Sequence, residues 1–140
     1  LEQFNYFENK NLNIVPINFD IAQKITEEID KDFEVAWDSP MEFFEKGAFG
    51  YCLVENNKII SIAWAYFISE SKVEIAVKTL EKYRGRGLSA YVTSAMIKSS
   101  FERNKSPYWG CNKSNVPSIK LGEKLGFKIK NEYYWIYPQV

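Results

Sequence analysis

The spacing of apolar residues changes along the chain and separates helical from extended stretches. In residues 20–33, Ile21, Ile25 and Ile29 recur every four positions, which predicts one apolar face of a helix. The short apolar stretch at residues 11–17 predicts a strand before that helix. The amino-terminal part is therefore expected to be a strand followed by a helix.

A second, shorter helix is predicted after Ser39. Serine is a favoured N-cap, and Pro40 suits the first helical position because its missing N–H has no helical partner there. Gly47 and Gly50 then mark the end of this helix.

From residue 50 to residue 77 the pattern is extended. Residues 50–69 read as two strands joined at Asn56-Asn57, a pair that tolerates the left-handed backbone of a tight turn. Residues 73–77, VEIAV, follow as a third strand. We expect these three strands to form the centre of a sheet.

Helical and extended stretches alternate in the rest of the chain. Leu88, Val92, Ala95 and Met96 form a helical stripe that ends near Asn104. The stretch SPYWGCN reads as a strand, a helix capped by Asn115 runs to about Leu125 with Gly126 as its stop, and FKIKNEYYWIY closes the chain as a strand or hairpin. This order predicts a mixed α/β domain around a twisted sheet.

Composition excludes several function classes. Lys plus Arg and Asp plus Glu both number 18, so the zero net charge argues against a nucleic-acid binder that works by bulk phosphate neutralisation. The chain has no histidine, which excludes Ser-His-Asp and Cys-His mechanisms, and we expect no metal site. Cys52 and Cys111 are expected to be reduced thiols buried in strands.

The length and the apolar runs bear on domain count and location. A chain of 140 residues fits one domain. It has no apolar run of membrane-spanning length and no signal-peptide pattern, so we expect a cytoplasmic protein with no membrane partner. The first residue is Leu1, which leaves open a natural start further upstream.

The stretch RGRG, residues 84–87, stands between a predicted strand and a predicted helix. A helix start presents unpaired N–H groups at the positive end of its dipole, and glycines let a ligand approach the backbone. With Arg84 and Arg86 beside it, this segment predicts a phosphate or pyrophosphate site. An ordinary glycine-rich turn with solvated arginines is the alternative. The spacing fits neither a Walker A loop nor a Rossmann fingerprint.

Two motifs here resemble those of the GCN5-related N-acetyltransferases. The segment VEIAVKTLEKYRGRGLSAYV resembles that family's motif A, with Lys82 in place of the usual Gln or Arg before the glycines. Asn115-Val-Pro-Ser118, followed by Leu125-Gly126-Phe127, resembles its second signature at the right spacing. The resemblance spans roughly residues 10–137. Three stretches, Phe43 to Cys52, EIAVKTLEKYRGRGLS and WGCNKSNVPSIKLGEKLGF, are narrowly similar to the zwittermicin A resistance protein subfamily.

The resemblance implies the acyl-CoA N-acyltransferase fold, a central and mostly antiparallel twisted sheet with helices on both faces. It also implies that acetyl-coenzyme A is the donor, with its pyrophosphate on the glycine loop and its pantetheine arm along the end of the fourth strand. The backbone amide of Val77 would then polarise the thioester carbonyl. The residues expected to bind the coenzyme are Val77, Lys78, Thr79, Lys82, Tyr83, Arg84, Gly85, Arg86, Gly87, Leu88, Ser89, Asn115 and Ser118. For Asn115, a simple N-cap role is the alternative.

Two positions carry the catalytic expectations. Glu74 lies in an apolar strand on the face opposite Val73 and Ile75, and the resemblance makes it the candidate base that takes the proton of the acceptor amine. A structural glutamate is the alternative. Many family members place a tyrosine, as general acid, where this chain has Gly122. A mid-helix glycine predicts close packing or ligand clearance, and the acid is left open between Tyr83, Tyr133, Tyr134 and water.

A few further residues are candidates for the site. Cys111 has no histidine to activate it as a nucleophile, so burial in a strand is expected instead. Trp64 and Trp109 are candidates to line the acceptor cleft, and core packing is expected for the other tryptophans. One of Lys113, Lys120 and Lys124 is a candidate contact for the 3′-phosphate of coenzyme A, with solvated charge as the alternative.

The sequence and the resemblance together predict a metal-free N-acetyltransferase that moves an acetyl group directly from acetyl-coenzyme A to the amine of a small molecule or peptide. Residues 1–140 are expected to form one domain, either alone or as the carboxy-terminal half of a longer protein. It would act as a monomer or homodimer, with antibiotic resistance as a family-level suggestion. The alternatives are a catalytically weak coenzyme A sensor and a plain phosphate-binding domain.

Overall fold

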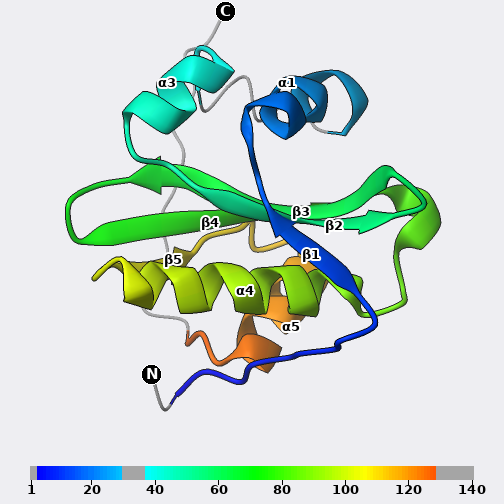
Figure 1. Cartoon of the computed structure of the whole chain (residues 1–140). Coiled ribbons are helices and arrows are strands. Elements are labelled where there is room, and N and C mark those ends of the chain that lie inside the picture. The colour runs from blue at the N-terminus through cyan, green and yellow to red at the C-terminus, as the bar shows by residue number, and fades with distance from the viewer. Residues whose placement is uncertain (1–2, 30–36, 129–140) are drawn as a thin grey trace, which may run out of the picture.

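The computed structural model describes residues 3–29 and 37–128, which form a sheet with helices on both faces (Figure 1). The strands are β1 (Asn13–Pro16), β2 (Gly50–Glu55), β3 (Lys58–Ile68), β4 (Lys72–Thr79) and β5 (Ser106–Trp109). The helices are α1 (Phe19–Glu28), α3 (Pro40–Glu45), the short 3₁₀ helix η1 (Glu81–Tyr83), α4 (Leu88–Glu102) and α5 (Val116–Leu125).

The five strands lie in sequence order, β1-β2-β3-β4-β5, and all neighbours are antiparallel except the parallel pair β4 and β5. This confirms the expected mixed fold with a mostly antiparallel sheet. The pairing of β4 with β5 ends at Ile75 opposite Trp109, although β4 continues to Thr79. Within the described residues, positions 76–79 therefore pair with β3 on one side only.

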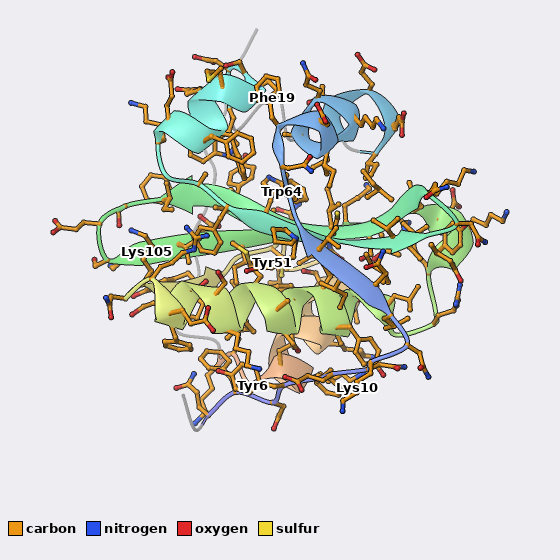
Figure 2. The ribbon with its side chains drawn as sticks, in the orientation of Figure 1. Tyr6, Lys10, Phe19, Tyr51, Trp64 and Lys105 are labelled. Carbon is orange, nitrogen blue, oxygen red and sulfur yellow. The ribbon has the colours of Figure 1, made fainter. Side chains whose placement is uncertain are left out.

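The two faces of the sheet are covered by different helices. Helices α1 and α3 lie above the sheet in the view of Figure 1, and α4 lies below it with α5 beside α4. Trp64 points toward α1 and α3, whereas Tyr51 lies between the sheet and α4 (Figure 2). Trp64 is fully buried in the main core, so the prediction that it lines the acceptor cleft is wrong.

Turns and caps follow the sequence pattern closely. Asn56 and Asn57 have φ values of 51° and 61°, and they close the β2–β3 hairpin as predicted. The hydroxyl of Ser39 accepts a hydrogen bond from the amide of Glu42 at 3.1 Å, which caps α3. The predicted short helix after Ser39 is therefore confirmed, together with its cap.

The amino-terminal segment, residues 3–12, runs along α4 and α5 below the sheet (Figure 1). The amide of Asn5 donates to the carbonyl of Leu125 at 2.9 Å, and its side-chain amide donates to the carbonyl of Lys124 at 3.0 Å. A Cβ at Gly126 would collide with the carbonyl oxygen of Gln3, so glycine is required where this segment passes the end of α5. The sequence pattern did not reveal this packing.

The two cysteines lie in different surroundings. Cys52 is fully buried in β2, and burial raises the pKa of its thiol to about 11. Cys111 is exposed, because β5 ends at Trp109 and the chain leaves the sheet before reaching it. The prediction of a buried strand cysteine is right for Cys52 and wrong for Cys111.

Some predictions fall beyond the described residues. Helix α1 ends at Glu28, and the rest of the helix predicted at 20–33 lies mostly in the undescribed range 30–36. The closing strand or hairpin, including Tyr133 and Tyr134, also lies outside the described residues from position 129 onward. Among the helices that are described, none is long and apolar enough to cross a bilayer.

Candidate coenzyme and acetyl-transfer site

The link between β4 and α4 contains the RGRG segment. After η1, Gly85 and Gly87 have φ values of 81° and 71°, in the left-handed region where residues other than glycine are strained. A Cβ on either glycine would meet no protein atom within 4 Å. Both glycines are therefore required by the backbone conformation, and the loop faces open space.

The amino terminus of α4 is an open electropositive end. Gly87 is its N-cap, and within the described residues no side chain accepts from the first-turn amides and no acidic residue lies in that turn. Since the first N–H groups of any helix lack intrahelical acceptors, the amides around Leu88 and Ser89 are available to an anion. The anion site expected from the sequence stays a prediction, which this backbone geometry would allow.

The cationic side chains of the loop are partly engaged within the protein. The Nε of Arg84 donates to the carbonyl of Thr79 at 3.0 Å, which ties the loop to the end of β4. Arg86 forms an exposed ion pair with Glu55 at 3.5 Å, which contributes little to stability. The Lys82 ammonium and the Arg86 guanidinium lie 5.7 Å and 5.9 Å from the centre of the Tyr83 ring. The loop thus holds three cations without burying any of them.

The end of β4 leads directly into this loop. Its residues Val77, Lys78 and Thr79 pair with β3, and the Thr79 hydroxyl lies 2.8 Å from the hydroxyl of Ser61. On the other side, pairing with β5 has already ended at Ile75. Within residues 3–29 and 37–128, the backbone of 76–79 therefore has an open strand edge, which an extended ligand could join by main-chain hydrogen bonds.

The second sequence motif lies at the start of α5. The side chain of Asn115 accepts from the amide of Ser118 at 3.3 Å, which confirms the N-cap. The carbonyl of Ser118 accepts from the indole Nε1 of Trp109 at 3.1 Å. Asn115 and Ser118 are thus connected through Trp109 to the end of β5, although no described contact joins them to the glycine loop.

Gly122 faces the Trp109 indole. A Cβ at Gly122 would lie 2.7 Å from Cδ1 of Trp109, so close packing explains the mid-helix glycine. The indole also stacks on Phe127, with 5.4 Å between ring centres. Trp109 thus packs against α5, and a side chain larger than glycine at position 122 would collide with it.

Glu74 is half-buried on β4, between Val73 and Ile75, which are buried on the opposite face. Its carboxylate approaches the backbone just after β5, because a Cβ on Gly110 would lie 2.7 Å from Oε1 of Glu74. Within residues 3–29 and 37–128, no ion pair neutralises this carboxylate. Glu74 therefore stands one residue before the point where β4 and β5 stop pairing, as a carboxylate able to accept a proton.

The three candidate lysines are all exposed. The ammonium of Lys124 lies 4.7 Å from the centre of the Phe7 ring, so it contacts the amino-terminal segment. Lys113 precedes α5 and Lys120 lies on it. The structure thus separates Lys124, which has a protein partner, from the two that project into solvent.

Known proteins share this architecture. The family model described as GNAT acetyltransferase matches residues 1–136. The uncharacterized N-acetyltransferase YdfB of Bacillus subtilis is 34% identical over 128 residues, which cover 91% of this chain and 49% of YdfB. The chain thus spans about half the length of that curated relative.

Solved structures of other proteins have a similar fold. A GCN5-related N-acetyltransferase-like protein from Streptococcus suis superposes with a TM-score of 0.78 at 24% identity, over 88% of this chain and 49% of that one. The aminoglycoside N-acetyltransferase AAC(6')-Iy, solved in complex with CoA, superposes with a TM-score of 0.71 at 14% identity, over 91% of this chain and 100% of that one.

Proposed function

This chain belongs to the GNAT acetyltransferase family, and we propose that it catalyses direct transfer of an acetyl group from acetyl-coenzyme A to the amine of a small molecule or peptide. The observation that carries the proposal is the open edge of β4 that runs into the uncapped start of α4. One extended ligand with a pyrophosphate at one end could pair with the edge of β4 and also bind the free amides at the start of α4. The complex of the related fold with CoA supports this choice of donor.

The donor would be held mainly by backbone groups. The amides from Gly85 to Ser89 would bind the pyrophosphate, and the edge at Val77 and Thr79 would pair with the pantetheine arm. Lys82, Arg84 and Arg86 would add positive charge around the phosphates. Asn115 and Ser118 would lie on the far side of the arm, with Asn115 also serving as the N-cap of α5.

The transfer needs one bond formed and one broken. The amine nitrogen attacks the thioester carbonyl carbon, the C–N bond forms, and the C–S bond breaks to release the thiolate of coenzyme A. The Val77 amide would stabilise the developing oxyanion, and Glu74 would accept an amine proton directly or through water. Gly122 has no hydroxyl to protonate the sulfur. A thiol with a pKa of about 8.5 can nevertheless leave as the thiolate.

Residues 1–140 would form one acetyltransferase domain, either alone or as the carboxy-terminal half of a longer protein. Membership of the zwittermicin A resistance protein subfamily is a finer proposal, supported by the matching tracts around the glycine loop and Gly122. The related aminoglycoside N-acetyltransferase makes modification of an amine-bearing antibiotic a reasonable activity to assay.

The proposal is tested by calorimetric titration with acetyl-coenzyme A and by thiol release across a panel of primary amines that includes an aminoglycoside. We expect saturable binding and amine-dependent thiol release. Glu74→Gln should lower kcat/KM by at least about 100-fold and flatten its acidic limb, with coenzyme affinity unchanged. The matched exposed variant Glu27→Gln should behave as wild type. Absence of coenzyme binding would overturn the proposal, and binding without thiol release would favour a sensor.

A further inference from the structure

Three side chains form a row across the sheet beside the proposed transfer site. Phe67 on β3 and Tyr108 on β5 are both directly opposite Glu74 of β4 in the strand register. Residues directly opposite in adjacent strands project to the same face, so the carboxylate is flanked by two aromatic rings. Phe67 is 57% exposed and Tyr108 38% exposed. We call these residues the Phe67–Glu74–Tyr108 row.

The row lies on the face of the sheet that carries α1 and α3. Glu74 is two positions from Ala76, which pairs with Trp64, and Trp64 points toward those helices (Figure 2). The helices cover Trp64 completely but leave Phe67 and Tyr108 open to solvent. Among the described residues, the row is therefore an exposed part of the face that carries α1 and α3.

A hollow of about 230 Å³ begins at Phe67 and extends toward α3. It is lined by Trp37, Glu42, Lys46, Tyr66, Phe67 and Ile68. A β-bulge contributes to its shape, because Ala65 pairs with Ile75 while Phe67 pairs with Glu74, which leaves Tyr66 as the extra residue. Both members of the Tyr66-Phe67 pair line the hollow. A ligand bound at Glu74 would thus find an aromatic wall next to it.

The chemistry of the row favours a cation. The carboxylate of Glu74 has no ion-pair partner in the described part of the chain. The Lys72 ammonium lies 5.1 Å from the centre of the Tyr108 ring, which shows that this ring attracts a cation; a ligand ammonium would displace it from Tyr108. Ring faces attract ammonium groups, and an exposed ring offers a flat apolar body a surface to stack on. An anion would meet the charge of Glu74 at the row, whereas in the hollow the charges of Glu42 and Lys46 offset each other.

We propose that the acceptor is a primary ammonium ion joined by a short chain to a flat apolar ring. This inference rests on the proposed function and specifies its acceptor. The ammonium binds over Glu74 between the two rings of the row, and the body of the acceptor stacks on Phe67 and enters the hollow beside α3. Phe67 and Tyr108 then determine specificity, while Glu74 both attracts the cation and removes its first proton.

The proton balance of this arrangement is complete. The bound ammonium gives one proton to Glu74, which passes it to solvent, and the neutral amine attacks the thioester. The second proton leaves the nitrogen as the amide forms and ends on the thiolate of coenzyme A. One ammonium and one acetyl-coenzyme A thus yield one amide, one free thiol and one released proton.

Three probes separate the effects of charge and ring. Phenethylamine carries both features, butylamine carries the charge without the ring, and 3-phenylpropionate carries the ring with the opposite charge. We expect phenethylamine to bind at least about five-fold more tightly than either of the others in an NMR titration. In Phe67→Ala, phenethylamine should no longer bind more tightly than butylamine. In Glu74→Gln, phenethylamine should no longer bind more tightly than 3-phenylpropionate.

The control is Phe19→Ala, which removes another exposed aromatic on the α1 side, outside the row, and should leave both advantages intact (Figure 2). Equal affinity of the three probes, or a ring advantage that survives Phe67→Ala combined with Tyr108→Ala, would overturn the inference. The titrations are run with and without coenzyme A, and coenzyme affinity is measured separately. A failure of donor binding would thus count against the proposed function, and a wrong probe ranking against the acceptor alone.

Discussion

At the scale of single residues, Gly122 shows how the lack of a side chain shapes the site. The Trp109 indole occupies the space a side chain at position 122 would need, and it is held there by its hydrogen bond to Ser118 and by stacking on Phe127. The position at which the family resemblance implies a tyrosine is thus closed by tryptophan packing. In the proposed reaction, the proton that the leaving thiolate takes up would therefore not come from a side chain at position 122.

Gly122→Ala is expected to destabilise the protein, although alanine favours a helix over glycine by about 1 kcal/mol. The added methyl would lie 2.7 Å from an indole that cannot easily move, and overpacking of this kind costs about 1–3 kcal/mol. Urea unfolding measures the change. In a Trp109→Leu background, Gly122→Ala should leave the free energy of unfolding unchanged or raise it. If Gly122→Ala alone makes the protein more stable than wild type, the packing argument is contradicted.

Sequence reasoning reached Gly122 only in part. A mid-helix glycine predicted close packing or ligand clearance, but the partner, Trp109, is brought there by the β5–α5 connection and has no sequence signal of its own. The predicted burial of Cys111 was wrong for a related reason. Its apolar neighbours suggested a strand, yet β5 ends at Trp109, and the end of a short strand depends on pairing with β4 rather than on local composition.

At the scale of elements, the amino-terminal segment acts as a brace for α5. Its extended backbone passes the end of that helix, and Asn5 supplies two donors to the last carbonyls of α5. The Phe4 ring packs against Phe101 of α4 and against Phe127. The segment therefore joins the two helices that lie on the same side of the sheet as the proposed coenzyme site.

Asn5→Ala should loosen the last turn of α5 while α4 stays intact. It removes a 3.0 Å hydrogen bond at an exposed position, so a loss of about 0.5–1.5 kcal/mol is expected. Amide hydrogen exchange should become faster near Leu125 and stay unchanged in the middle of α4. Asn11→Ala, at an exposed position of the same segment, is the control. Uniform exchange changes in both helices would show that Asn5 does not act locally.

Elements with local signals were predicted well, and those that depend on distant contacts were not. The β2–β3 hairpin, the caps of α3 and α5 and the stop at Gly126 all depend on a few adjacent residues. The amino-terminal brace depends on hydrogen bonds between residues more than 100 positions apart, such as Asn5 with Lys124. Residues 3–12 also lack a helical or strand period, so no local pattern marks them.

At the scale of the whole molecule, the order of elements predicted a mixed α/β domain, and the resemblance of the two motifs to a known family implied the mostly antiparallel sheet with helices on both faces. The point at which β4 and β5 stop pairing was not visible in the sequence. Strand β4 continues past β5 without a break in its pattern, since its Val77 and Thr79 also suit a strand that pairs on one side only.

The stability of the whole domain should fall in alkaline solution because of Cys52. Burial raises the pKa of this thiol from 9.0 to about 11 in the folded state. Between those values the unfolded chain releases the proton and the folded chain keeps it, so the free energy of unfolding decreases as pH rises. Thermal unfolding from about pH 8 to about pH 11 should show this decline.

Cys52→Ala is the matched variant for that measurement. It should be less stable than wild type at neutral pH, since it leaves a cavity in the core, but its stability should decline less steeply above about pH 9. Identical slopes for the two proteins would exclude ionisation of Cys52 as a cause. The exposed Cys111 should react with a thiol reagent in the folded state, and Cys52 only after unfolding.

The bulge at Tyr66 also bears on how such a molecule changes during evolution. Losing one codon within a strand ordinarily turns every later side chain to the wrong face. Here the extra residue is already accommodated, so deletion of Tyr66 would restore regular pairing with Phe67 still opposite Glu74 and with Ala65 still opposite Ile75. A lineage could thus change the wall beside the proposed acceptor site by a single change in length, while the segments proposed to bind the donor are inherited unaltered.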